Sequence, residues 1–128
     1  MRAMLLRLGF CLCAMLLAPA NAAEYPTRPV HIIVGLTAGS GVDIMARMVA
    51  QKLGDSMGQP FIVENRPGAG SNIATRYAAS QVPDGYTIFI STIANTINAT
   101  LYKNLPFDTL KDFSPVILGA TSPNILIV

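Results

Sequence analysis

The chain has 128 residues, of which 52% are apolar and only 12% are charged, and this balance excludes a disordered acidic or basic protein. Its formal charge is +2, from nine Lys and Arg residues against seven Asp and Glu residues. Two of the basic residues, Arg2 and Arg7, lie in a leader-like segment, so the remainder carries equal numbers of both signs and predicts no nucleic acid partner.

Residues 1–22 have the pattern of a cleavable signal peptide. The two arginines precede an apolar run over residues 8–18, and Ala20-Asn21-Ala22 supplies a small-residue cleavage site. As a helix this run spans about 16 Å, well short of the ~30 Å hydrocarbon core, so we expect no permanent membrane anchor. Cys11 and Cys13 both lie in the leader, and its removal leaves no cysteine for a disulfide or for thiolate chemistry. The expected product is an exported, periplasmic protein.

The first expected unit is a strand, a loop and a helix. Residues 30–36 form a nearly continuous apolar and β-branched run, typical of a strand buried on both faces of a parallel sheet. A glycine-bearing loop breaks this run, and residues 41–57 then have the period of an amphipathic helix. Ser40 and Asp43 resemble a capping box at its start, and Gly58 is expected to end it. We expect its core side to contain Met45, Met48, Val49, Leu53 and Met57.

A second unit of the same kind follows. Residues 61–63 form a short apolar strand, and residues 65–70 form a turn that contains proline and glycine. Residues 72–80 are expected to form a helix that buries Ile73 and Tyr77. Two consecutive units of this type predict an α/β fold with a doubly wound, mostly parallel sheet.

The remaining elements are shorter. We expect a strand at 86–90, a polar loop at 91–95, a short helix at 98–103, and strands at 116–118 and 125–128. The chain stops inside the last apolar run with no turn, cap or polar tail, and an exposed β-branched strand invites aggregation. We therefore interpret residues 23–128 as part of a truncated domain.

The sequence offers little material for catalysis. His31 is the single histidine and lies inside the first strand, where a satisfied or edge-exposed side chain is a simpler interpretation than a general base. There is no Gly-x-Ser-x-Gly motif, and the scattered carboxylates match no zinc or calcium ligand spacing. The sequence therefore predicts no catalytic residue, no metal site and no cofactor.

Backbone groups, in contrast, predict a binding site. The loops at 37–41 and 67–71 each follow a strand and precede a helix, and such loops gather at one edge of a parallel sheet. Helix N-termini present free N–H groups and the positive end of a dipole, so two of them can hold a carboxylate without an arginine. Neutral side chains near this edge are Ser40, Ser71, Asn72, Ser91, Thr92 and Asn95. We expect a ligand that is a small anion or a polar organic acid.

Several interpretations stay open from the residues alone. Asp43 is most simply a charge that complements the helix dipole, and Arg66 is either a solvated or ion-paired loop residue or a residue that faces a ligand. A dinucleotide-binding oxidoreductase would use Glu64 as its ribose-binding acid, but the third glycine of that fingerprint is missing. The residues are also compatible with a structural or interaction module without a small ligand, and with a non-functional truncated gene product.

Motifs along the chain resemble the Bug family, the TctC-like periplasmic solute receptors of tripartite tricarboxylate transporters. The most specific is the string Glu64-Asn65-Arg66-Pro67-Gly68-Ala69-Gly70. The others include Tyr25-Pro26-Thr27-Arg28-Pro29, Ala38-Gly39-Ser40-Gly41-Val42-Asp43, Gly58-Gln59-Pro60, Pro83-Asp84-Gly85-Tyr86-Thr87 and Leu105-Pro106-Phe107-Asp108. The resemblance covers the whole chain after the leader.

The resemblance implies a two-lobed, type II-like periplasmic binding protein, of which residues 23–128 hold the first part of lobe 1. It implies a receptor and not an enzyme, which closes on a small organic acid or amino acid and passes it to membrane permease subunits. A fragment without the second lobe is expected to bind weakly or not at all.

The resemblance also implies that main-chain N–H groups and ordered waters of the first loop hold a ligand carboxylate. The ligand-binding residues carried over are Thr37, Ala38, Gly39, Ser40, Gly41 and Asp43, then Gly68, Ala69, Gly70, Ser71 and Asn72, and finally Ser91, Thr92 and Asn95. The sequence departs from the family pattern at Gly35-Leu36, where Pro-Phe is common, at Ser40 and Ser71, which replace glycines, and at Val42, which replaces a hydroxyl residue.

Overall fold

The computed structural model describes residues 24–121, so the predicted signal peptide and the strand expected at 125–128 lie outside the described residues. Three strands form one sheet in the order β2-β1-β3, with β1 at Val30–Val34, β2 at Phe61–Asn65 and β3 at Thr87–Ile90. Both pairings of the central strand are parallel. The prediction of a parallel α/β sheet is therefore confirmed.

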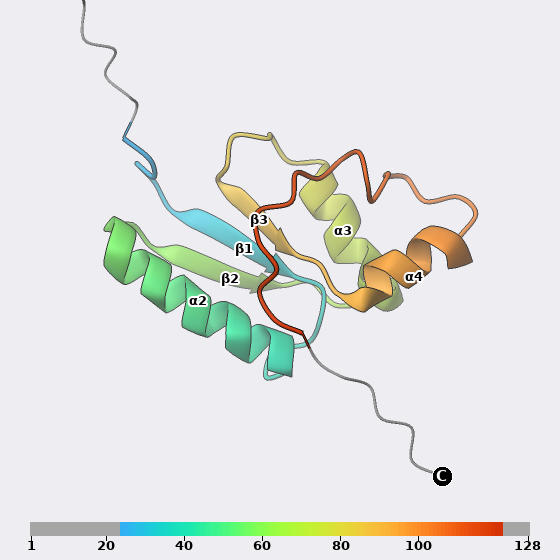
Figure 1. Cartoon of the computed structure of the whole chain (residues 1–128), viewed down its shortest axis with the longest axis horizontal. Coiled ribbons are helices and arrows are strands. Elements are labelled where there is room, and N and C mark those ends of the chain that lie inside the picture. Colours follow the sequence, from blue (N-terminus) through green and yellow to red (C-terminus); the bar gives the residue numbers. More distant parts are fainter. Residues whose placement is uncertain (1–23, 122–128) are drawn as a thin grey trace, which may run out of the picture.

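Helices cover both faces of this sheet (Figure 1). Helix α2, Gly41–Met57, connects β1 to β2 and packs on these two strands. Helix α3, Asn72–Ala79, connects β2 to β3, crosses β1 in the opposite direction and packs on β3 and β1. Right-handed crossovers in opposite directions place their helices on opposite faces, which is the doubly wound arrangement.

The core side of α2 differs from the prediction. Its buried residues are Asp43, Ala46 and Ala50, whereas Met48, Val49 and Met57 are exposed. The predicted core side was based on residues spaced four apart. In a helix of 3.6 residues per turn, each step of four residues rotates the side-chain direction by about 40°, so this row of residues drifts away from the face that contacts the sheet. The alanines instead let the helix lie close to Ile32 and Val34 of the central strand. Met48, Val49 and Met57 were therefore wrongly assigned to the core, whereas Met45 and Leu53 are half-buried.

The predicted end of α2 at Gly58 is confirmed, and the predicted capping box at its start is confirmed in part. The Ser40 side chain accepts from the N–H of Asp43 at 3.3 Å, but the Asp43 side chain accepts from the N–H of Gly39 and not from that of Ser40. Gly58 ends the helix with φ of +70° and donates to the carbonyl of Gly54.

The second half of the chain also corrects several expectations. In α3 the buried residues are Ala74 and Thr75, while Ile73 is 44% exposed. Helix α4, Ile93–Leu101, begins within the expected polar loop at 91–95, because the Asn95 side chain accepts from the N–H of Thr92 and so caps the helix start. Residues 116–118, expected as a strand, are irregular and exposed.

The opposite end of the sheet is closed by contacts between residues 25–28 and the turn at 84–86. The Tyr25 hydroxyl donates to the carbonyl of Gly85 at 2.6 Å, and Arg28 pairs with Asp84 at 2.8 Å. The Arg28 guanidinium also lies 3.9 Å from the ring centre of Tyr86. Among residues 24–121, no helix is both long and apolar enough to cross a bilayer.

Candidate functional site

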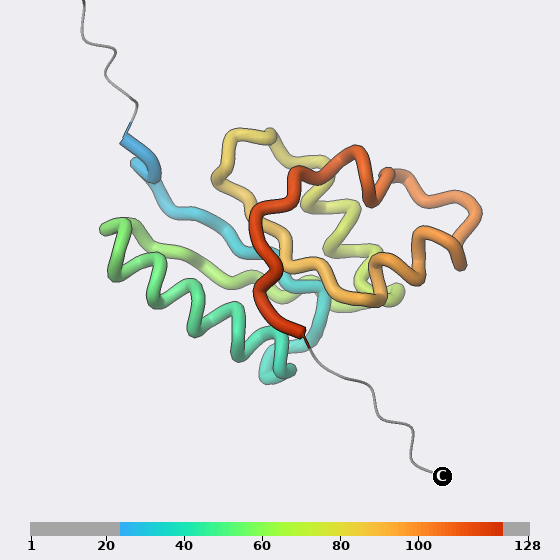
Figure 2. Tube along the Cα trace, in the orientation of Figure 1, coloured from blue at the N-terminus to red at the C-terminus, as the bar shows by residue number. Residues whose placement is uncertain are grey.

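The three strands end at the same edge of the sheet. In the strand register, Val34 at the end of β1 is paired with Asn65 at the end of β2 and with Ile90 at the end of β3. The loops that follow therefore begin side by side, as the tube in Figure 2 shows. We define the first loop as residues 35–40, the second loop as residues 66–71 and the third loop as residues 91–92. The sequence correctly predicted that the loops after the strands share this edge.

The first loop presents exposed backbone. Thr37, Ala38, Gly39 and the helix-starting Gly41 are exposed, and Gly39 has φ of +82°. The N–H of Ser40 donates to the carbonyl of Thr37, and the N–H of Gly39 donates to Asp43, so these two donors are already used. Within residues 24–121, the N–H groups of the exposed residues Thr37, Ala38 and Gly41 have no acceptor. Two of these donors lie in the first loop and the third lies at the adjacent start of α2, and a ligand could take them.

Asp43 lies behind the first loop. Its side chain is 2% exposed, and its carboxylate accepts from Gly39, from Arg47 at 3.0 Å and from the Asn65 side chain at 2.9 Å. The hydrogen bonds from Arg47, Gly39 and Asn65 lower the pKa of Asp43 to about 2. Asp43 was expected among the ligand-binding residues, but its oxygens are occupied within the protein. Its position supports the loop and does not line the exposed surface.

Asn65 extends this network and was not expected as a site residue. Its amide nitrogen donates to the carbonyl of Leu36 at 3.1 Å, and its amide oxygen accepts from Arg47 at 3.0 Å. The side chain thus connects the end of β2 to the first loop. A polar residue directly after an apolar strand at the carboxyl edge was the sequence signal that could have identified it.

The second loop has an unusual backbone. Four consecutive residues, Gly68, Ala69, Gly70 and Ser71, have positive φ angles of 124°, 46°, 61° and 76°. The short turn η1, Ala69–Ser71, is therefore left-handed, and the N–H groups of Ser71 and Asn72 donate to the carbonyls of Gly68 and Ala69. Residues 68–70 are exposed, and the N–H groups of Ala69 and Gly70 have no acceptor within residues 24–121. Non-glycine residues in this region are uncommon and costly, and strained residues of this kind cluster at functional sites.

The third loop supplies one exposed hydroxyl group. Ser91 is exposed and Thr92 is half-buried, whereas Asn95 is 2% exposed. The Asn95 oxygen accepts from Thr92 and Ser91, and its nitrogen donates to Thr75 at 2.7 Å. Asn95 therefore connects α4 to α3 and does not face outward. Asn72 of the second loop region is likewise held, by the Asn98 side chain at 2.9 Å.

The nearby charged residues are paired with each other. Arg66 bonds to Glu64 at 3.0 Å and lies 3.5 Å from the ring centre of Tyr77, and His31 contacts the other oxygen of Glu64 at 2.5 Å. Burial acts to raise the pKa of Glu64, but the hydrogen bonds from His31 and Arg66 outweigh it, so the pKa is lowered. His31 is thus a satisfied strand histidine and Arg66 an ion-paired residue, as expected.

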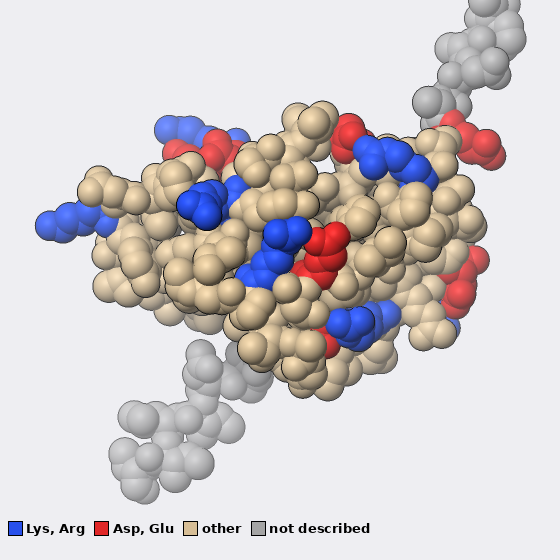
Figure 3. Space-filling view, turned by 180° about the vertical axis from the view of Figure 1, so that it is seen from behind, with Lys and Arg blue, Asp and Glu red and all other residues tan. Residues whose placement is uncertain are grey.

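The charges form no extended patch on the face shown in Figure 3, where basic and acidic side chains lie singly or in pairs. Among residues 24–121, no group of three His, Cys, Asp or Glu side chains is arranged to hold a metal ion. The exposed residues of the three loops, which are 37–39, 67–70 and 91, carry no charged side chain, so most hydrogen-bond donors that they offer are backbone N–H groups. Such a surface can bind an anion or a polar group.

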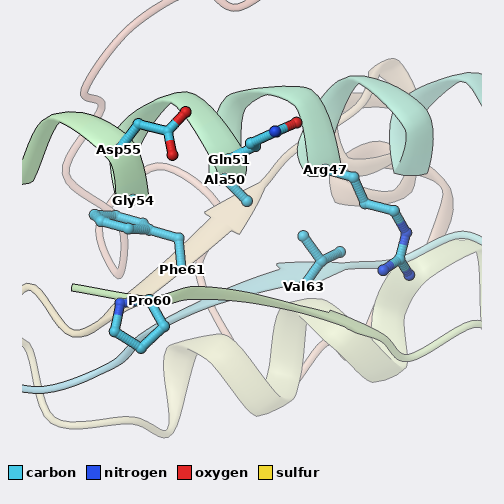
Figure 4. A pocket seen from close by; sticks show the side chains of 8 residues that line it. All are labelled: Arg47, Ala50, Gln51, Gly54, Asp55, Pro60, Phe61 and Val63. Carbon is cyan, nitrogen blue, oxygen red and sulfur yellow. The ribbon is translucent and has the colours of Figure 1, made fainter. Parts of the chain in front are cut away.

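A hollow of about 410 Å³ lies elsewhere, between α2 and the outer side of β2 (Figure 4). Its lining is mixed, with the apolar Ala50, Pro60, Phe61 and Val63, the polar or charged Arg47, Gln51 and Asp55, and Gly54. None of the expected ligand-binding residues lines it. The sequence did not predict this hollow, because it depends on how far α2 stands from an edge strand.

Comparison with known proteins identifies the family. Residues 45–128 match the family described as tripartite tricarboxylate transporter family receptor. The chain belongs to this receptor family. Its members are solute receptors and not enzymes, so the dinucleotide-binding oxidoreductase is set aside. Glu64, its proposed ribose-binding acid, is occupied by His31 and Arg66.

Relatives of this receptor family include BugT of Bordetella pertussis, which is 38% identical over 120 residues. That match covers 92% of this chain and 37% of BugT, so the chain spans little more than a third of this relative's length. A UPF0065 protein of Bordetella bronchiseptica is 41% identical over 106 residues, which cover 82% of this chain and 32% of that protein.

Solved receptor structures have the same fold. An R. palustris protein with adipate is 40% identical with a TM-score of 0.67, and the match covers 73% of this chain and 32% of that chain. MatC from Rhodopseudomonas palustris with bound malate is 31% identical with a TM-score of 0.67, and the match covers 72% of this chain and 32% of that chain. The likeness confirms the predicted periplasmic binding protein fold.

Proposed function

We propose that this protein is the ligand-capturing receptor of a tripartite tricarboxylate transporter and that it binds a small carboxylate at the edge with the three loops. In this proposal the leader at 1–22 directs export to the periplasm, and membrane permease subunits receive the ligand. The observation that carries the proposal is the register of Val34 with Asn65 and Ile90, which starts all three loops at one edge.

Backbone donors would make the contact with the ligand carboxylate. The free N–H groups of Ala38 in the first loop, of Gly41 at the start of α2, and of Ala69 and Gly70 in the second loop supply donors without a buried positive charge. Carboxylates accept such hydrogen bonds strongly at helix starts, where the dipole adds a favourable field. Exposed hydroxyl groups such as that of Ser91 would then contact polar atoms of the ligand.

Dicarboxylic acids are the first ligands to test, because two structural neighbours of this chain were solved with adipate and with malate. Amino acids also carry a carboxylate, and the same backbone N–H groups would donate to it. The proposal therefore specifies a small molecule with at least one carboxylate and leaves the rest of its structure to measurement.

We propose further that residues 23–128 form the first part of lobe 1. The chain covers about a third of its relatives, whose remaining length would supply the rest of lobe 1 and a second lobe. A ligand held between two lobes favours the closed state by its higher affinity for that state. Residues 23–128 alone are then expected to bind weakly, since the contacts from the second lobe and from the rest of lobe 1 are missing.

A thermal-shift titration tests the ligand class. The protein as its gene encodes it, including any sequence after Val128, is titrated with adipate, malate, an amino acid and NAD, with adipamide as the neutral match for adipate. A carboxylate is expected to raise Tm with concentration, because a ligand that binds only the folded state stabilises it. A rise with NAD or adipamide and none with any carboxylate would overturn the proposal.

Two further measurements test the remaining parts. Isothermal calorimetry of residues 23–128 alone should show little or no heat with a dicarboxylate, and micromolar binding would contradict the need for a second lobe. Osmotic-shock fractionation with N-terminal sequencing should find a periplasmic protein that starts at residue 23. A product that keeps its leader in the cytoplasm would contradict the assigned location.

A further inference from the structure

Gly35, the first residue after β1, lies directly against Ser71 at the end of the second loop. A Cβ atom placed on Gly35 would lie 1.6 Å from the Ser71 Oγ, 2.7 Å from its Cβ and 3.2 Å from its Cα. No real side chain tolerates the first two distances, so any residue with a Cβ at position 35 has to displace Ser71. The requirement for glycine here comes from this contact and not from a positive φ.

Ser71 is held in this place at an evident cost. It is 2% exposed, has φ of +76° and is not glycine, and its Oγ has no hydrogen-bond partner within residues 24–121. It precedes α3 at the N-cap position without capping the helix by its side chain. A buried hydroxyl without a partner and a left-handed serine both disfavour folding, so neither explains the contact as a source of stability.

The second loop is also held from its other sides. The Asn98 side chain donates to the carbonyl of Gly70 at 2.7 Å, and the Thr75 hydroxyl donates to the carbonyl of Ser71 at 2.8 Å. These bonds hold the loop toward α4 and α3. Gly35 is the first residue of the first loop, so its contact with Ser71 sets how closely the end of the second loop approaches the first loop.

We propose that Gly35 and Ser71 are a positioning pair, which sets the distance between the free N–H groups of the second loop and those of the first loop. This proposal rests on the proposed function, since both sets of donors are assigned to one ligand carboxylate. Ser71 does not touch the ligand in this role. It acts through the placement of Ala69 and Gly70, to which it is joined in the left-handed turn η1.

A double-mutant cycle tests the pair. Gly35→Ala forces Ser71 and the second loop away from the first loop, and Ser71→Gly removes the two atoms with which the new methyl group collides. The double variant G35A/S71G keeps only the 3.2 Å approach to the Cα of residue 71, which a small shift relieves. Gly54→Ala is the matched control for an added methyl group, because its Cβ would lie 3.4 Å from the Gln59 carbonyl, away from the three loops.

Three quantities are measured for the protein as its gene encodes it: affinity for the best carboxylate of the thermal-shift panel, Tm, and the amide NMR shifts of Ala69 and Gly70. Gly35→Ala should weaken binding about tenfold or more at a temperature where the variant stays folded, and it should move both amide signals. The double variant should recover most of the affinity and return the signals. Gly54→Ala should leave affinity and both signals unchanged.

The remaining outcomes would count against the pair. Unchanged affinity and unchanged amide signals in Gly35→Ala would overturn the positioning role, and so would a double variant as weak as Gly35→Ala. A lower Tm with unchanged affinity would assign the pair to stability alone and would also overturn the proposal. If the wild-type protein binds no carboxylate, the proposed function fails, while the amide signals still show whether the pair sets the loop position.

Discussion

The carboxylate of Asp43 accepts a hydrogen bond from the N–H of Gly39 at 2.8 Å, four residues earlier in the chain. This bond folds the first loop back onto the start of α2, while Arg47 donates to the same oxygen and Asn65 donates to the other oxygen of the carboxylate. The ionised form of Asp43 is therefore bonded by three donors in the folded protein. Because the exposed part of the loop depends on these bonds, ionisation of Asp43 is coupled to the geometry of the candidate site.

We predict that Asp43 makes stability depend on pH in the acid range. Its pKa is about 2 in the folded protein and 3.8 without these contacts, so its contribution is fully present above pH ~4. The contribution is lost as the pH falls from about 4 to about 2, where the folded protein must also take up the proton. Tm measured from pH 2 to pH 6 should fall on the acid side, and Asp43→Asn should flatten this fall and lower Tm at pH 6.

Asp55→Asn is the control, because Asp55 is an exposed carboxylate on the same helix. It should leave both the acid limb and Tm at pH 6 close to those of the wild type. An Asp43→Asn variant with the wild-type acid limb would show that other carboxylates cause the pH dependence. Such a result would contradict the proposed coupling between the ionisation of Asp43 and the geometry of the first loop.

Asn65 provides a second prediction about the first loop. Asn65→Ala leaves the carbonyl of Leu36 and one oxygen of Asp43 without their donor, so the free energy of unfolding should fall by about 1–3 kcal/mol in urea titration. Asn65→Asp should lower the free energy of unfolding further than Asn65→Ala, because it sets a second carboxylate against Asp43 in place of a donor. An Asn65→Asp variant as stable as the wild type would mean that the network with Asp43 does not form in solution.

The sequence predicted the layout of the strands and loops more reliably than the direction of individual side chains. The β-branched run after Pro29 and the switch to helical period after Ser40 both correspond to elements in the structure. Both signals are local, since they depend on chain geometry within a few residues. The common edge of the loops then follows from parallel pairing alone.

Side chains that depend on packing were harder to predict. Asp43 and Asn95 are polar residues at helix starts, where a ligand contact and a cap have the same sequence pattern, and the structure assigns both to contacts within the protein. The contact of Gly35 with Ser71 joins residues 36 positions apart and depends on the path of the second loop. Local patterns contain no information about such an approach.

Two glycines of the candidate site should respond differently to the same substitution. Gly68 has φ of +124°, and a Cβ there would lie 2.7 Å from the Ile73 Cδ1, so Gly68→Ala should lower the free energy of unfolding by about 1–3 kcal/mol. Gly41 starts α2 with no atom within 4 Å of an added Cβ, so Gly41→Ala should be neutral or slightly stabilising. Urea titration of both variants tests the contrast. Equal losses would mean that the second loop does not hold its left-handed backbone in solution.

Substitution of Arg66 tests whether a cationic side chain takes part in ligand binding. It is held by Glu64 and by the ring of Tyr77, and both members of the ion pair are partly exposed. Arg66→Gln should therefore change the free energy of unfolding by about 1 kcal/mol or less and leave the affinity for a carboxylate within about twofold of the wild type. Calorimetry at low and high salt measures both the affinity and its screening. If Arg66→Gln loses tenfold or more in affinity and the loss shrinks at high salt, Arg66 leaves Glu64 to contact the ligand, and the site depends on a positive charge as well as on backbone donors.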